Sequence, residues 1–113
     1  MLPAEIAQLG VAAPGLPEGA VGWTAQSALK LFRSLPGKLA IGGVSVFDRV
    51  QWGFAPSDDA WRTFRRVNES ATDYAIRSRR EARDWIENFP REEVLFVIEL
   101  DDQAMAAEAI NPA

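Results

Sequence analysis

The sequence predicts an α+β fold in which a small antiparallel sheet packs against two or more helices in a single domain. Apolar residues recur at helical spacing over residues 25–35 and again over 71–89. Segments rich in β-branched and aromatic residues lie at 38–54 and 93–100. The chain has 113 residues, 48% of them hydrophobic and 25% charged, which is the size and composition of one globular domain.

We expect residues 1–22 to form an N-terminal arm and residues 23–113 to form the α+β domain. The arm begins with a possible short helix over 4–9 and continues through an irregular segment at 13–19 that is rich in Pro and Gly. Its apolar residues allow it to pack onto its own domain, which we favour, or to reach another subunit.

The first helix of the domain is expected over 25–35, with Thr24 as N-cap and Pro36 as its stop. The segment 38–54 is expected to hold two or three strands. In that segment Gly42 and Gly43 would form a tight hairpin turn, because glycine tolerates positive φ.

A second helix is predicted over 58–67, capped by Ser57 and carrying an apolar edge of Trp61, Phe64 and Val67. A longer helix over 71–89 follows, starting near Ser70 and stopped by Pro90. Its apolar stripe is the strongest in the chain: Ala71, Tyr74, Ala75, Ser78, Ala82, Trp85, Ile86 and Phe89.

Residues 93–100 read as a strand that is apolar on both faces, which suits a central strand or one covered on both sides. Asp101 and Asp102 would then cap a last helix over 103–110, whose thin apolar edge suggests fraying or docking on a partner. All four tryptophans are expected in the core, with Trp23 as the possible exposed exception.

The chain contains no histidine and no cysteine, which removes the usual metal ligands, the usual proton shuttle and thiol chemistry. No phosphate-binding glycine loop is present either, so we predict no cofactor and no metal. The N-terminus lacks the pattern of a secretory signal, and no apolar run is long enough to span a membrane. We therefore expect a cytoplasmic protein that makes no membrane contact.

The net charge of −4 is divided along the chain. Residues 60–91 hold eight arginines and five acids, a local charge of +3, so the remainder carries −7. Such asymmetry can orient a partner or a second copy of the same protein.

The arginines lie among aromatic residues, a combination found at protein interfaces and at nucleic-acid surfaces. The overall acidity disfavours a phosphate binder. The alternative is that these arginines have no binding role and lie on a solvated helix face in i, i+4 ion pairs, such as Asp73 with Arg77. The candidate partner-binding residues are Trp61, Arg62, Arg65, Arg66, Arg77, Arg80, Asp101 and Asp102.

Two further groups could carry chemistry. The acidic residues serve as helix caps or solvated groups in the ordinary reading; the alternatives are mimicry of a phosphate backbone and binding of a divalent cation. Asp48, Tyr74 and Arg49 could form an acid/base site if the fold brings them together.

The leading hypothesis is a non-catalytic protein-binding module: an inhibitor, an adaptor or an assembly subunit of bacterial or phage origin. It rests on the missing catalytic chemistry, the divided charge and the apolar arm. A small cofactor-free enzyme or small-molecule-binding domain is one alternative, and an arginine-mediated nucleic-acid binder is the other.

Overall fold

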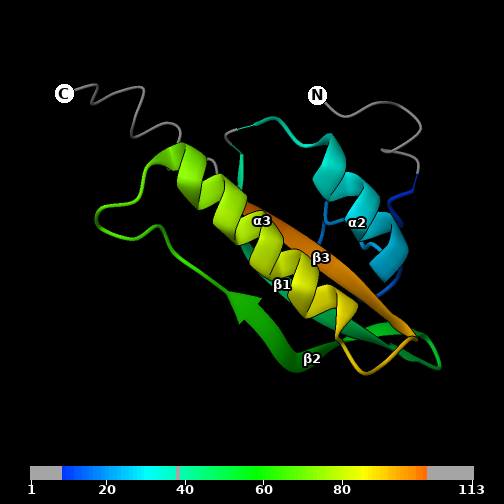
Figure 1. Ribbon diagram of the computed structural model, residues 1–113. Helices are drawn as coiled ribbons and strands as arrows, with labels where there is room; N and C mark the ends of the chain where they lie inside the picture. Colours follow the sequence, from blue (N-terminus) through cyan, green and yellow to red (C-terminus); the bar gives the residue numbers. More distant parts are fainter. Residues whose placement is uncertain (1–8, 38, 102–113) are drawn as a thin grey trace.

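The computed structural model describes residues 9–37 and 39–101, and it confirms the α+β class (Figure 1). Three strands form one antiparallel sheet in the order β2-β1-β3, with α3 lying across it and α2 beside α3. The elements are α2 (Ala25–Ser34), β1 (Ala40–Val50), β2 (Gly53–Arg62), α3 (Ala71–Glu87) and β3 (Val94–Asp101).

Both long helices begin where their capping residues predict. The Thr24 hydroxyl accepts a hydrogen bond from the Ser27 backbone N–H, and the Ser70 hydroxyl accepts one from the Asp73 N–H. Each cap satisfies a backbone donor that the first helical turn leaves unpaired. Helix α3 ends at Glu87, two residues before the predicted end.

The predicted hairpin turn at Gly42 and Gly43 was wrong, because both glycines lie inside β1 and the chain turns at residues 51–52. Gly43 leaves room for the guanidinium of Arg62, which crosses over it; a Cβ there would force that flexible side chain to move. Gly42 lies where the pairing of β1 with β3 shifts register, between Ile41 and Gly43.

The predicted helix over 58–67 was also wrong, because β2 continues to Arg62 and the chain then leaves the sheet as a loop. After a shift in register between Pro56 and Ala60, pairing with β1 resumes and extends to Arg62 opposite Gly43, so residues 60–62 are held in the sheet. Ser57 caps no helix; its hydroxyl accepts from the Asp59 N–H within β2.

Strand β3 is an edge strand, and β1 takes the central position. Strand β3 is nevertheless apolar because both of its faces are covered near its start. Val94 and Phe96 belong to the core beneath the helices, whereas Leu95 contacts Gly22 on the other face. Trp23 also exchanges two backbone hydrogen bonds of 2.8 Å with Phe96, covering part of the free edge.

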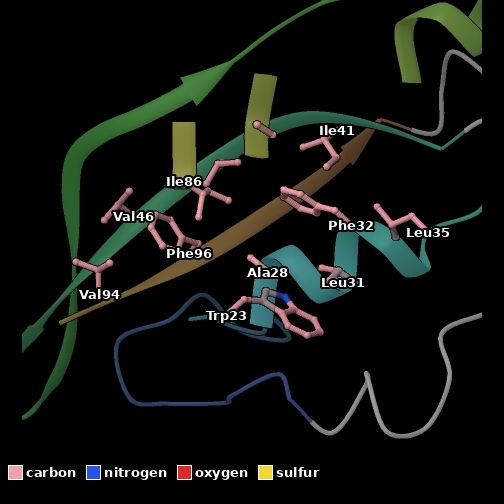
Figure 2. Close-up of a cluster of buried hydrophobic side chains, with 12 residues drawn as sticks. Trp23, Ala28, Leu31, Phe32, Leu35, Ile41, Val46, Ile86, Val94 and Phe96 are labelled. Atoms are coloured by element: carbon pink, nitrogen blue, oxygen red, sulfur yellow. The ribbon is translucent and has the colours of Figure 1, made fainter. Parts of the chain in front are cut away.

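One cluster of buried residues joins α2, α3 and the helix-covered face of the sheet (Figure 2). Trp23, once the possible exposed exception, is in this core at 7% exposure. Trp61 and Trp85 are half-buried against it. Trp52 is 64% exposed at the β1–β2 turn, so its predicted burial was wrong.

Of the arm, residues 9–22 lie against this domain. Val11 and Gly22 form a two-way backbone bridge, and the Pro14 carbonyl accepts from the Phe54 N–H at 2.9 Å. Residues 1–8 of the arm and the predicted helix over 103–110 lie outside the described residues.

Candidate functional site

The structure divides the predicted arginine cluster between two places. Trp61 and Arg62 end β2, and Arg65 and Arg66 follow in a loop of residues 63–70, which we call the anchored loop. Arg77 of α3 lies against this loop, as its hydrogen bonds show below. Arg80 lines a separate groove between α2 and α3.

Arg77 anchors the loop from within the protein. Arg77 is 7% exposed, and each of the five N–H groups of its guanidinium donates a hydrogen bond of 2.7–3.0 Å. Glu69 accepts two of them in a bidentate pair, and the other acceptors are Glu81, the Thr63 hydroxyl and the Phe64 carbonyl. Arg77 therefore bonds mainly to acceptors in the loop, and not to Asp73, its predicted partner on the helix.

Glu69 organises the loop in turn. The Oε1 atom of Glu69, which is bound to Arg77, also accepts a hydrogen bond from the Arg66 backbone N–H at 3.1 Å. The backbone carbonyl of Glu69 accepts one from the Arg65 guanidinium at 2.7 Å. At the start of the loop the Thr63 N–H donates to the Gly42 carbonyl at 3.1 Å. These bonds tie the loop to itself, to β1 and to α3.

The ion pair shifts the pKa values of Glu69 and Arg77 so that the charged form of each is favoured. Hydrogen bonding to Arg77 is the main cause that lowers the pKa of Glu69 from 4.5 to about 2, against the opposing effect of desolvation. The same bond raises the pKa of Arg77 above its already high value.

Acid titration tests this pair. Between pH 4.5 and about 2 the unfolded chain protonates Glu69 before the folded protein does. The stability from this contact is thus complete above pH 4.5 and is lost as the pH falls toward 2. We expect urea midpoints of the wild type to fall through this window more steeply than those of Glu69→Gln. Equal slopes in the two proteins would contradict the assignment.

The anchored loop exposes two large apolar side chains. Phe64 is 77% exposed and Val67 is 99% exposed, although the backbone that carries them is held by Arg77 and Glu69. The sequence had placed both on the buried edge of a helix. The sequence carries one signal for this anchoring. Arg77 lies one helical turn after Tyr74, next to the apolar stripe, where an arginine can be drawn toward the protein interior.

Beside the loop, Arg62 and Glu99 form an ion pair of 2.6 Å across the glycine gap at Gly43. The neighbouring Asp101 accepts a 2.7 Å hydrogen bond from the hydroxyl of Tyr74. Burial, followed by this bond to a carboxylate, raises the pKa of Tyr74. Residues of the loop and of β3, including Phe64 and Leu100, line a groove of about 460 Å³ here.

Two other hollows lie on α3. Between α2 and α3, Arg80 lines a groove of about 500 Å³ with Arg33 and Arg83. Arg79 lies there too, but it donates to the carbonyls of Leu35, Pro36 and Leu39 and so ties the end of α2 to α3. The second hollow, about 550 Å³, lies between β2 and α3; it is lined by acids and by aromatic residues that include Trp61 and Trp85.

The possible acid/base site does not form. Asp48 pairs with Val94 near one end of β1, whereas Ala40 at the other end pairs with Asp101, the partner of Tyr74. Asp48 is bound instead to Arg91 at 3.0 Å. Within residues 9–37 and 39–101 no group of three acidic side chains could hold a metal ion. Asp102 lies outside these residues.

No helix in the described part of the chain has the length and apolar character needed to cross a bilayer. Comparisons with models of protein families, with curated proteins and with solved structures find no significant similarity to this chain.

Proposed function

We propose that this chain is a protein-binding module that binds its partner through the anchored loop. The observation that carries the proposal is the exposure of Phe64 and Val67 on a loop held by the buried Arg77. Aromatic side chains and arginine are enriched at protein interfaces, and the neighbouring Val67 adds apolar area that a partner can cover.

The anchoring favours binding for a second reason. A loop that is already ordered loses little conformational entropy when a partner covers it. Arg62 precedes Phe64 and Arg66 lies between Phe64 and Val67; both arginines are exposed, so they suit the polar part of such an interface. The expected partner surface is an apolar pocket bordered by polar or acidic groups.

At the anchored loop, the division of the arginines supports a protein partner over nucleic acid. A phosphate-binding surface needs several free cations on one continuous face. At the anchored loop, Arg77 is held in a buried ion pair and Arg62 is bound to Glu99; Arg80 lies with Arg33 and Arg83 in the separate groove between α2 and α3. The finer roles that we propose are inhibitor, adaptor or assembly subunit, in a cytoplasmic setting and of bacterial or phage origin; sequence composition is their support.

Binding is tested with Phe64→Ser/Val67→Ser and, as matched control, Trp52→Ser. Trp52 is also a large exposed side chain, at the far end of the β1–β2 hairpin. Each tagged protein is used to recover partners from a lysate of the encoding organism, with quantification by mass spectrometry. We expect a stoichiometric protein with wild type and Trp52→Ser, and about tenfold or greater loss with the loop variant. Recovery that is unchanged in the loop variant would contradict the proposal.

A further inference from the structure

The free edge of β3 carries a second feature that the anchored loop does not use. In an antiparallel strand, alternate residues direct their backbone N–H and C=O groups to the two sides. Phe96 directs both groups outward, to Trp23, so Ile98 and Leu100 also face outward. Among the described residues nothing hydrogen-bonds these outward groups of Ile98 and Leu100.

An apolar groove of about 290 Å³ runs beside this open stretch of the edge. Leu31 of α2 and Leu35, the C-cap of that helix, form one wall. Ile98 and Leu100 form the strand side, with Leu100 45% exposed. Trp23 and Leu39 complete the lining. A strand added at the edge would place alternate side chains in this groove, because residues opposite each other in a sheet share a face.

The opposite face of the edge is acidic. Glu99 lies between the two open residues, and its side chain is 53% exposed even though Arg62 contacts one oxygen at 2.6 Å. In an antiparallel pairing, the residue opposite Glu99 therefore meets a carboxylate. Pairing with a second copy centred on Glu99 would set two carboxylates against each other, which is unfavourable.

From this geometry we infer that the edge of β3 binds an extended peptide segment of a partner protein in the order apolar, basic, apolar. The two apolar residues pair with Ile98 and Leu100 through four backbone hydrogen bonds and fill the groove. The basic residue lies opposite Glu99 on the other face. This is strand addition, a common form of peptide recognition at a sheet edge. The inference rests on the proposed protein-binding function and extends it to a surface that adjoins the anchored loop, since Glu99 and Leu100 also line the groove beside Phe64.

The probe is a blocked five-residue peptide in the order Thr, Val, Lys, Val, Thr, titrated into the full chain at up to millimolar concentration. We expect saturable shifts and slowed hydrogen exchange at the amides of Ile98 and Leu100. A peptide with glutamate in place of lysine should bind about fivefold more weakly. A peptide methylated on both valine nitrogens should not bind, since it lacks the required donors.

Glu99→Lys supplies the reciprocal test. This variant should reverse the preference between the lysine and glutamate peptides, whereas Glu92→Lys, with the same change of net charge on an exposed acid before β3, should keep it. Loss of the peptide in Phe64→Ser/Val67→Ser would assign it to the loop and overturn the inference, whereas retention there keeps the two surfaces distinct.

Three further results would overturn the inference. The first is the absence of saturable binding, and the second is equal binding of the N-methylated peptide. The third is sedimentation of the free chain as a dimer with Ile98 and Leu100 already protected, which would assign the edge to a second copy.

Discussion

Replacing Arg77 with methionine is expected to lower the free energy of unfolding by about 3–5 kcal/mol, because it leaves a mostly buried carboxylate without its counterion. The substitution keeps an unbranched apolar side chain but removes the guanidinium and all five hydrogen bonds, including the bidentate pair with Glu69. Chemical denaturation followed by tryptophan fluorescence measures the change. Arg77→Met should also weaken partner binding, because the anchored loop loses its preformed shape.

Two comparisons make this result specific. Arg80→Met, an exposed arginine on the same helix, should change stability by less than about 0.5 kcal/mol. Adding Glu69→Leu to Arg77→Met should recover part of the loss, because the uncompensated carboxylate is then gone. A single Arg77→Met variant that unfolds at the wild-type urea concentration would show that the pair does not support the loop.

Phe96→Ala is expected to cost about 3–5 kcal/mol, the usual range for a buried phenylalanine. Phe96 is 1% exposed, and its ring packs edge-on against Trp85 and Phe89 at centroid distances of 6.3 and 5.4 Å. Since natural domains are stable by only about 5–15 kcal/mol, this loss would bring the protein close to unfolding at room temperature.

Phe64→Ala is the matched control, because it removes the same atoms from a side chain that is 77% exposed. We expect it to change the unfolding free energy by less than about 0.5 kcal/mol. Comparable losses in the two variants, measured by urea denaturation, would contradict the burial of Phe96 or the exposure of Phe64. If Phe64→Ala leaves the free energy of unfolding unchanged, Phe64 is not needed for folding and can contribute to binding.

The sequence alone determined the two helices α2 and α3 and the class of fold. The N-caps Thr24 and Ser70 and the apolar stripe of α3 act within one or two helical turns, so a local reading of the chain detects them. It also placed β3 within one residue at each end. Of the candidate residues, Arg62, Arg65, Arg66 and Arg77 lie in or beside the anchored loop, whereas Trp61 lines the hollow between β2 and α3 and Arg80 the groove between α2 and α3.

The tertiary structure alone decided what those residues do. Residues 58–62 carry a helix-like pattern but lie in β2, where residues 60–62 pair with β1, and Gly43 leaves room for Arg62 from another strand. Arg77 looked like a solvated arginine, and only the fold brings Glu69 against it. Strand pairing and buried ion pairs join residues far apart in the chain, whereas periodicity and capping report only on near neighbours. The exposed Phe64 and the open edge at Ile98 follow from these long-range contacts.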